Sequence, residues 1–490
     1  MNEKQYHLLC EACDRVLQST ELTIERVAIA WLHVLNEHPT NLAKYLDLFA
    51  GKHLSPFIGV KSMLLQAIQC FKLRQRSYSI DCLTNNVDVI FVSHLLNSAQ
   101  LGAEEDFYFG SLPEILNENG ISNIVILRDH RSIDQKNISI KRKQGMSPRF
   151  LLPNVLPLTM EAFLWKCLHS EAIHLRAQAK KSKKNLHQRI LFHSSKHAIS
   201  SLSIATLRLY HQILSIVERI RPKAIVVTYE GHAWERLAFA AARKIVPEVL
   251  CIGYHHTILR PLSHSIERSL GSLYDPDYIL TAGNITREMI KNKLTMPHTK
   301  VNVLGTHRKT QEIPLLSIKK SSCCLIIPEG IIDESTLLLD FALKCSYLAP
   351  NVHFILRLHP IISFKELEIR DSRLKKFPSN FELSKKSITD DFLRSRWALY
   401  RSSSAAVFSI LAGVRPIYLS QENEIKIDPL HELTSWRCIV NQPADFLSIV
   451  IADSKMTISE QIKEFTPAHF YCKQYFMPMN FAGFKKIITG

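Results

Sequence analysis

The stretch VDVIFVSHLLN, Val87 to Asn97, decides the fold class of this chain. Its Val, Ile and Phe residues follow one another with little polar alternation, which predicts a strand buried on both faces. The stretch SLPEILNENG, Ser111 to Gly120, predicts a short helix with a Ser cap, a Pro in its first turn and a Gly at its end. A second strand is predicted over ISNIVILRDH, Ile121 to His130. Strand, helix and strand in this order predict a parallel sheet with right-handed crossovers.

The same alternation of strands and helices recurs in both halves of the chain. In the first half it covers PKAIVVTYEGHAWERLAFAAARKI, Pro222 to Ile245. In the second half it covers SSCCLIIPEG (Ser321 to Gly330), NVHFILRLHP (Asn351 to Pro360) and RWALYRSSSAAVFSILAGVRPIYL (Arg396 to Leu419). Because 490 residues are too many for one ordinary core, we expect an α/β protein of two Rossmann-like domains that face a cleft.

The predicted domain limits follow from this pattern. Residues 1–80 are expected to be helical, as in ERVAIAWLHVLNEH (Glu25 to His38), where apolar residues recur at helical spacing. The first Rossmann-like domain is predicted over 81–275 with a helical insertion, and the second over 276–460. The tail, 461–490, is expected to pack back on the first domain. Ligands of such sheets bind outside the carboxyl ends of the strands, so we look for the site there.

Composition favours an anionic partner. The formal net charge is +16, which suits nucleotide phosphates, an acidic glycan or an anionic membrane surface. The densest basic run lies within residues 176–190 and is either a solvated face or a contact with an anionic membrane. No zinc-finger spacing or RNA-binding aromatic signature accompanies the charge, so nucleic acid is not expected as a partner.

Cysteine usage and the N-terminus indicate a cytoplasmic protein. The 11 cysteines are odd in number and scattered along the chain, which is typical of reduced thiols. The N-terminal residues are charged and amphipathic, unlike a signal peptide. No apolar run reaches the roughly 18 residues of a membrane span, so any membrane contact is expected to be peripheral, at the inner face of the cytoplasmic membrane.

One candidate site is the end of HFILRLHPIISF, His353 to Phe364, together with a later serine turn. Pro360 ends the strand, and alternation places Arg357 and His359 on one face. Ser402, Ser403 and Ser404 lie between a strand and a helix, where hydroxyls and free N–H groups can bind a phosphate. Taken singly, the serines can be a helix cap, His359 a plain strand-end residue, and Arg357 the neutraliser of a nearby carboxylate. Their coincidence at the ends of successive strands favours a phosphate site.

Acidic residues at the ends of first-domain strands are the candidates for a general base. Glu230 follows the strand AIVVTY and precedes a helix, so its carboxylate is expected to face the cleft with a pKa raised by partial burial. The competing interpretation is that Glu230 caps that helix or pairs with Arg236. Glu104, Glu105 and Asp106 are the other base candidates, unless they form a solvated acidic loop. His94 and His256 are further strand-end residues on this acceptor side.

The H-P dipeptide with a later Ser-Ser turn resembles the bacterial sialyltransferases and Kdo transferases of GT-B fold. In those families the histidine and the serine motif bind the phosphate of a CMP-sugar. The stretch LIIPEG also resembles their acidic-acidic-glycine motif through Glu329 and Gly330, with Pro328 in place of the first acid. The wider order of motifs, over roughly residues 85–435, resembles bacterial surface-carbohydrate biosynthesis proteins.

The resemblance implies a glycosyltransferase that moves a sialic, legionaminic, pseudaminic or Kdo-type sugar from a CMP-sugar to a surface glycan. Lipopolysaccharide, capsule or a lipid-linked glycan are the acceptors it implies. His359 and the serines would stabilise or protonate the leaving phosphate, and an acid of the first domain would take the acceptor proton. The stretch FSILAGVRP, Phe408 to Pro416, lacks the Glu that binds the donor ribose in enzymes that use UDP- or GDP-sugars. A phosphate site built from a histidine and a helix N-terminus does not require a metal, so neither a metal nor another cofactor is expected.

Two other functions stay open on the sequence. One is a polyol-phosphate transferase that uses CDP-glycerol, which would share the fold and a comparable phosphate site. The other is a non-catalytic protein of GT-B type that acts as a scaffold.

Overall fold

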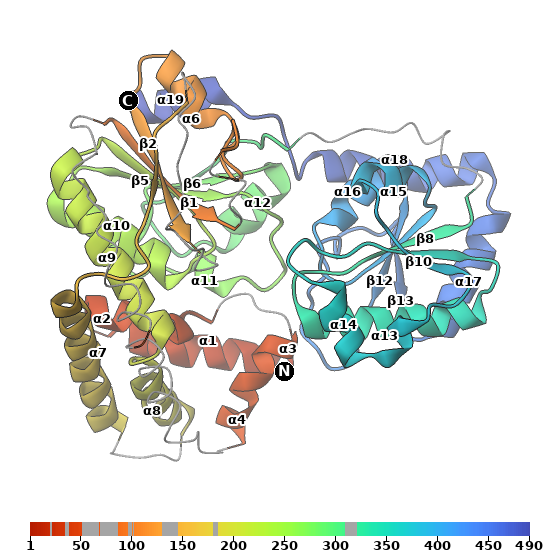
Figure 1. Cartoon of the computed structure of the whole chain (residues 1–490), viewed down its shortest axis with the longest axis horizontal. Coiled ribbons are helices and arrows are strands. Elements are labelled where there is room, and N and C mark those ends of the chain that lie inside the picture. The colour runs from red at the N-terminus through yellow and green to blue at the C-terminus, as the bar shows by residue number, and fades with distance from the viewer. Residues whose placement is uncertain are drawn as a thin grey trace.

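The computed structural model describes residues 1–19, 22–34, 39–50, 68, 87–96, 100, 102–129, 146–179, 185–308 and 321–490. Two α/β domains lie side by side, each built on one parallel sheet (Figure 1). This is the arrangement of a GT-B fold, and the predicted fold class is confirmed.

The first sheet has seven strands in the order β3-β2-β1-β4-β5-β6-β7. Its strands are β1 (Val89–Leu95), β2 (Asn123–Asp129), β3 (Arg149–Leu151), β4 (Ala224–Thr228), β5 (Leu250–His255), β6 (Tyr278–Thr281) and β7 (Lys300–Val303). Its helices are α6 (Leu112–Glu118), α7 (Leu158–Ala179), α8 (Leu186–His197), α9 (Ser201–Ile220), α10 (Ala233–Ile245), α11 (His264–Glu267) and α12 (Asn284–Lys293).

Strand β1 confirms the interpretation of the opening stretch. Ile90 and Val92 belong to the core on one face of the sheet, whereas Val89 and Phe91 belong to the core on the other. The strand pairs in parallel with β2 on one side and β4 on the other. The strand order therefore reverses direction between β1 and β4, which is where a parallel sheet opens a crevice at its carboxyl edge.

The second sheet has six strands in the order β10-β9-β8-β11-β12-β13. They are β8 (Cys323–Ile327), β9 (His353–Leu356), β10 (Phe381–Leu383), β11 (Trp397–Tyr400), β12 (Arg415–Leu419) and β13 (Cys438–Val440). Its helices are α13 (Ile332–Leu348), α14 (Phe364–Arg370), η7 (Ser372–Lys375), α15 (Ile388–Leu393), α16 (Ala405–Leu411), α17 (Pro443–Lys455) and α18 (Ile458–Lys473). The crevice of this sheet opens between β8 and β11.

The boundary between the domains lies further along the chain than predicted. Strands β6 and β7 pair with β5 in the first sheet, although a boundary after residue 275 assigns them to the second domain. Both strands are only four residues long, and their sequence carries no sign of which sheet they join. The crossover to the second domain therefore falls between β7 and β8.

The N-terminal segment is helical in pieces: α1 (Glu3–Leu17), α2 (Ile24–Val27), η1 (Ala30–His33), α3 (Pro39–Leu42), η2 (Ala43–Tyr45) and α4 (Leu46–Phe49). Over Glu25–Val34 a single helix does not form, because Ile29 leaves the helical conformation. Residues 35–38 lie outside the described residues. Buried contacts lie on both sides of the break: Arg26 binds Glu171 of α7 at 2.6 Å, and His33 accepts from Arg268 at 2.7 Å. Most of 51–86 lies outside the described residues.

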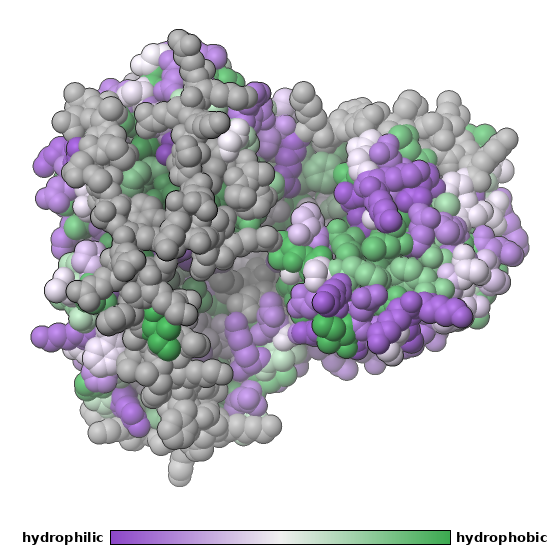
Figure 2. Space-filling view, in the orientation of Figure 1, coloured by the Kyte–Doolittle hydropathy of each residue, from purple (hydrophilic) through white to green (hydrophobic). Residues whose placement is uncertain are grey.

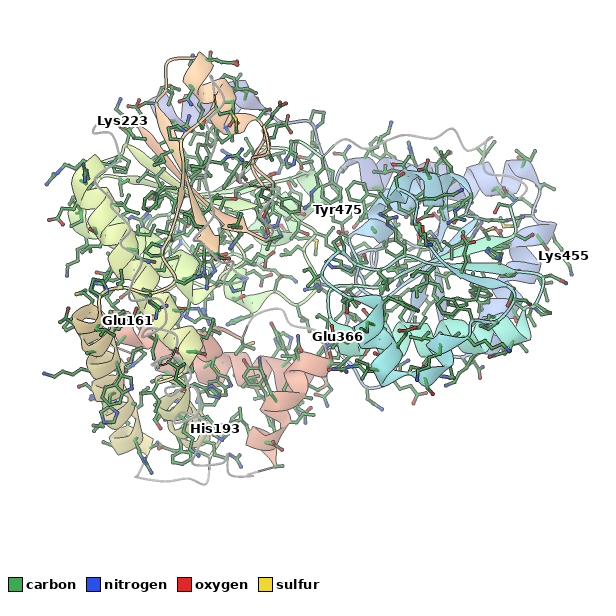
Figure 3. The ribbon with its side chains drawn as sticks, in the orientation of Figure 1. Glu161, His193, Lys223, Glu366, Lys455 and Tyr475 are labelled. Carbon is green, nitrogen blue, oxygen red and sulfur yellow. The ribbon has the colours of Figure 1, made fainter. Side chains whose placement is uncertain are left out.

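The C-terminal residues return to the first domain. Helix α18 packs on α16, and α19 (Phe481–Thr489) lies beside α6 on the first domain (Figure 1). Tyr475 lies between the two domains (Figure 3), and the ring of Phe476 stacks on Phe408 at 4.8 Å. In the space-filling view hydrophobic residues form a band across the second domain (Figure 2).

The structure tests only one of the two predictions about membranes. Among the described residues, no helix combines the length and apolar character needed to span a bilayer. Residues 180–184, at the centre of the basic run, lie outside the described residues, so peripheral membrane contact stays a prediction.

Candidate functional site

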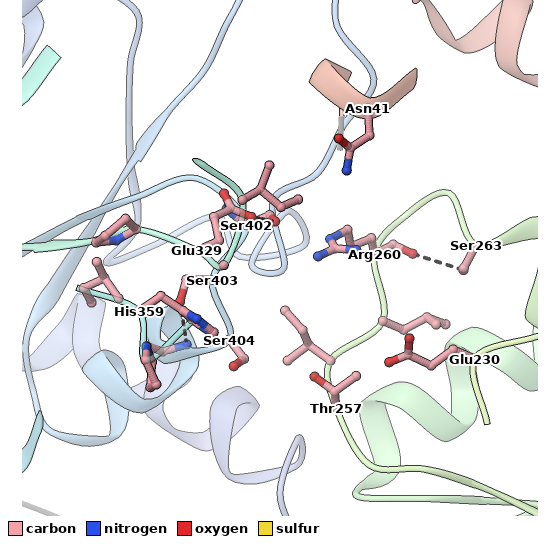
Figure 4. A pocket seen from close by; sticks show the side chains of 18 of the residues that line it. Asn41, Glu230, Thr257, Arg260, Ser263, Glu329, His359, Ser402, Ser403 and Ser404 are labelled. Atoms are coloured by element: carbon pink, nitrogen blue, oxygen red, sulfur yellow. Dashed lines mark hydrogen bonds between the residues drawn. The ribbon is translucent and has the colours of Figure 1, made fainter. Parts of the chain in front are cut away.

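A cavity of about 510 Å³ lies between the two domains. The first domain lines it with the loops that follow β4 and β5, and the second domain with the loops that follow β8, β9 and β11. Figure 4 shows Glu230 and Arg260 on one side, His359 and the three serines on the other, and Asn41 of α3 above Arg260. The cavity thus joins the carboxyl edges of both sheets, where bound ligands are expected.

His359 lies on the second-domain wall against Gly330. A Cβ atom at Gly330 would lie 3.1 Å from Cε1 and Nδ1 of the imidazole, so glycine leaves room for the ring. The Nδ1 atom accepts the backbone N–H of Ile361 at 3.3 Å, which places the proton of the neutral ring on Nε2. Burial lowers the pKa of His359, with the charge of Glu329 opposing, so the neutral ring dominates at pH 7. It therefore donates a hydrogen bond from Nε2–H rather than a proton from an imidazolium.

The three serines have different environments. Ser402 is buried, and its backbone N–H and hydroxyl both donate to the carboxylate of Glu329, at 3.0 and 2.5 Å. Ser403 accepts the N–H of Ala405 at 3.3 Å, and Ser404 precedes α16 without a side-chain cap bond. All three serines line the cavity, but the N–H and hydroxyl of Ser402 are used to anchor the turn to Glu329.

Arg357 has a carboxylate partner. Its guanidinium lies 3.0 Å from Asp391, which is fully buried, and 2.6 Å from the carbonyl oxygen of Lys386. The alternative that Arg357 neutralises a nearby carboxylate fits these contacts. Pro360 follows in the same loop and also lines the cavity.

Glu230 faces the cavity. It neither caps the following helix nor pairs with Arg236, the two structural roles considered for it. Glu235 caps α10, because its carboxylate accepts the backbone N–H groups of Glu230 and His232 at 2.9 and 2.8 Å. Arg236 pairs instead with Asp275 at 2.5 Å. The carboxylate of Glu230 is left 42% exposed, with Nε2 of His232 at 3.3 Å.

The charge of Glu230 is set by its histidine neighbours. Burial raises the pKa of Glu230, but the hydrogen bond and charge of His232, helped by His256 and His255, outweigh burial and hold it well below its usual range. The expected rise does not occur. For His232, burial lowers the pKa, but the charge of Glu235 and the bond to Glu230 raise it overall. Burial raises the pKa of Glu235 to about 7. The site thus presents an ionised carboxylate at neutral pH.

The other base candidates are not among the described residues that line the cavity. Asp106 is buried and accepts from the hydroxyl of Ser93 at 3.0 Å and from the backbone N–H groups of Tyr108 and Phe109. It fixes the loop after β1. Glu104 and Glu105 are exposed on that loop.

His94 and His256 are not among the residues that line the cavity, although the charge of His256 acts on Glu230. His94 binds the hydroxyl of Thr228 at 2.8 Å, and its ring packs edge-on against Tyr108. His256 packs against Tyr108 from the other side, and burial lowers its pKa to about 3.

Arg260, Asn41 and His232 line the cavity and were not predicted from the sequence. Arg260 stands before Pro261, a few residues after β5, and so repeats the pattern of His359 before Pro360. That repetition is a usable signal. Asn41 carries none, because the helix that holds it is far away in sequence from both sheets.

Metal ligands are the remaining possibility for this site. The part of the chain that the structure describes contains no group of three His, Cys, Asp or Glu side chains placed to hold a metal ion.

Comparison with known proteins gives fold likeness only. No protein-family model matches the chain, and no curated protein matches it significantly. The kitacinnamycin glycotransferase superposes with a TM-score of 0.47 at 10% identity, covering 83% of this chain and 100% of that one. MurG of Acinetobacter baumannii gives 0.45 at 9%, with coverages of 82% and 99%. The UDP-GlcNAc 2-epimerase of Methanocaldococcus jannaschii gives 0.42 at 10%, with coverages of 79% and 99%. Function is therefore argued from the site.

Proposed function

We propose that this protein is a glycosyltransferase that uses a nucleotide-activated sugar in the cavity between its domains. One observation carries the proposal. A carboxylate held ionised by histidine, Glu230, stands across a single cavity from a set of hydrogen-bond donors suited to a phosphate. Glycosyl transfer needs this pair of functions, a base for the acceptor and stabilisation of the leaving phosphate.

The donor phosphate is assigned to the second-domain wall and to Arg260. Nε2–H of His359 and the hydroxyls of Ser403 and Ser404 supply neutral donors, and Arg260 supplies positive charge from the opposite wall. Ser402 does not take part, because its N–H and hydroxyl already bind Glu329. It holds the turn in place instead.

The donor is proposed to be a CMP-activated ulosonic acid sugar. The H-P and Ser-Ser pattern supports this assignment, since it resembles enzymes that bind a single nucleotide phosphate. Helix α16 also supports it, because its residues Ala405–Leu411 include no carboxylate for the ribose of a UDP- or GDP-sugar. A surface glycan, free or lipid-linked, is the proposed acceptor.

The reaction follows from these positions. The acceptor hydroxyl attacks the anomeric carbon while its O–H bond breaks and the proton goes to the carboxylate of Glu230. The bond from that carbon to the phosphate oxygen breaks, and its electron pair leaves with CMP through an oxocarbenium-like transition state. His359 and Arg260 stabilise the charge that gathers on the phosphate. His232, hydrogen-bonded to Glu230, keeps the carboxylate ionised and oriented.

The test combines nucleotide binding with turnover. Isothermal titration with CMP, CDP and UDP is expected to give binding of CMP that a second phosphate does not improve. Incubation with a panel of CMP-sugars and glycan acceptors is expected to release CMP only when an acceptor is present. Stronger binding of CDP would favour transfer from CDP-glycerol, and an absence of binding by all three nucleotides would favour a scaffold.

The variant Glu230→Gln separates the two halves of the site. It is expected to keep CMP affinity and to lose acceptor-dependent CMP release, because it removes only the base. Transfer at the rate of the unmodified protein would contradict this role for Glu230.

A further inference from the structure

A row of aromatic rings extends from Glu230 along the carboxyl edge of the first sheet, outside the cavity. The rings of Trp234, His94, Tyr108 and His256 follow one another with centroid separations of 5.1, 5.3 and 4.6 Å. They come from α10, β1, the loop after β1 and the residue after β5. Burial, with the charge of Glu230, raises the pKa of Tyr108, which places the carboxylate close to this row.

An arginine without an acidic partner lies at one end of the row. The guanidinium of Arg128, the residue beside His94 in the β1–β2 register, lies 5.1 Å from the ring centroid of Trp234. It forms no ion pair with any residue that the structure describes, and burial lowers its pKa to about 10. The nearest carboxylates have other partners: Glu235 binds two backbone N–H groups, and Asp129 accepts from Asn154.

Arg308 lies at the other end of the row and also lacks a carboxylate partner among the described residues. It follows β7 and is half-buried, and burial lowers its pKa against the opposing effects of Tyr254 and Tyr108. Beside it, Nδ1 of His256 and Nδ1 of His307 are buried without a hydrogen-bond partner.

Several other buried arginines among the described residues are neutralised. Arg26, Arg236, Arg268 and Arg401 each bind a carboxylate, at 2.6, 2.5, 2.9 and 2.6 Å. A guanidinium withdrawn from water without an anion is unfavourable, so its retention needs a counter-charge from elsewhere. Arg128 and Arg308 are therefore suited to a ligand that brings negative charge.

We propose that the ring row is the acceptor site and that the acceptor is anionic, with a phosphate or carboxylate bound by Arg128 and Arg308. This inference rests on the proposed function, because the acceptor hydroxyl must reach Glu230. Three of the rings, His94, Tyr108 and His256, are partly exposed and can contact sugar rings that extend from that hydroxyl, whereas Trp234 is buried. The arginines bind the charged groups. A glycan with acidic sugars and a glycosyl phosphate share this chemistry.

Thermal stability measured with two probes tests the site. Inorganic phosphate and glucuronate are added separately at constant ionic strength, with CMP present to fill the donor site. Either probe is expected to raise the melting temperature of the unmodified protein, because a ligand that binds the folded state stabilises it. The rise is expected to vanish in the Arg128→Gln, Arg308→Gln double variant. A response to glucuronate indicates an acidic sugar, and a response to phosphate indicates a glycosyl phosphate.

Controls keep the outcomes distinct. Arg287→Gln changes an exposed arginine that pairs with Glu288, and it should leave the rise intact. The Arg128→Lys, Arg308→Lys variant keeps the positive charges and should keep part of the rise in melting temperature. It serves as the test if the glutamine variant fails to fold. Equal rises in the unmodified and glutamine proteins, or none in the unmodified protein, overturn the inference. An arginine-dependent rise in a protein that CMP fails to stabilise would overturn the proposed donor while the anion site stands.

Discussion

His359 shows how one residue changes meaning with its surroundings. The sequence predicts a phosphate contact that can also give up a proton. In the structure the ring accepts from Ile361 through Nδ1, and burial lowers its pKa. The residue is thus a neutral hydrogen-bond donor at pH 7, and its role in the proposed site is to hold the leaving phosphate.

Replacing His359 with Ala is expected to weaken CMP binding by roughly 10- to 100-fold. Loss of a hydrogen bond to a charged group costs about 1.5–3 kcal/mol, which corresponds to that range. Titration calorimetry measures the change. His353→Ala is the matched control, since His353 lies at the start of the same strand and pairs with Glu382 away from the cavity. Equal losses in both variants would mean that the effect is not local.

His232 controls the ionisation of Glu230 and so the pH range of activity. Burial alone would raise the pKa of Glu230, and the hydrogen bond and charge of His232 reverse that effect. The variant His232→Asn removes the charge that opposes the effect of burial, so the pKa of Glu230 is expected to rise. Because the base acts only when deprotonated, activity should then be lost at higher pH as the solution is acidified.

The measurement is the pH profile of kcat/KM for His232→Asn. Its acid limb should move towards neutral pH relative to the unmodified protein, and the His353→Asn profile should not move. An unchanged acid limb in His232→Asn would show that Glu230 is not the group that titrates.

At the scale of elements, the turn from β4 to α10 positions the candidate base. Gly231 has a φ of +84°, and a Cβ atom there would lie 2.2 Å from the carbonyl oxygen of Ser265. The turn therefore excludes every side chain and places Glu230 and His232 on either side of it. The contact also fixes helix α11, which carries Ser265 into the cavity wall.

The variant Gly231→Ala is expected to lose stability and activity together. A residue other than glycine at this φ costs about 1–3 kcal/mol, and the clash with backbone forces the loop to move. Urea unfolding measures the stability and acceptor-dependent CMP release the activity. Gly271→Ala is the control, because Gly271 also has a positive φ, +95°, but open space around its Cβ position. It should lose stability alone.

The elements differ in how well the sequence predicts them. The buried strands β1 and β8 are predicted correctly because their sequences contain runs of apolar residues. Pro and Gly residues predict the loops that follow them. The break between α2 and η1 cannot be predicted in this way. Arg26 and His33 beside it bind Glu171 of α7 and Arg268 after α11, which are far away in sequence. The same limit applies to the site. His359 and Glu230 stand at strand ends, whereas Asn41 reaches the cavity only through tertiary packing.

At the scale of the molecule, the C-terminal segment ties the two domains together. It leaves α18 on the second domain, passes Gly283 and Gly305 of the first domain at close range, and ends in α19. A Cβ atom at Gly305 would lie 2.1 Å from the carbonyl oxygen of Pro478, so the two backbones touch. The first domain is therefore completed by residues that follow the whole of the second.

Phe484 anchors this return and gives a direct test of it. The side chain is 1% exposed and lies in the same core as Phe91 of β1, with their ring centroids 6.3 Å apart. Phe484→Ala leaves a cavity in that core and is expected to reduce the free energy of unfolding of the first domain by about 3–5 kcal/mol. Phe470→Ala is the matched control, because Phe470 is 67% exposed on α18. Urea unfolding followed by tryptophan fluorescence compares the two, and equal stability of both variants would contradict completion of the first domain by α19.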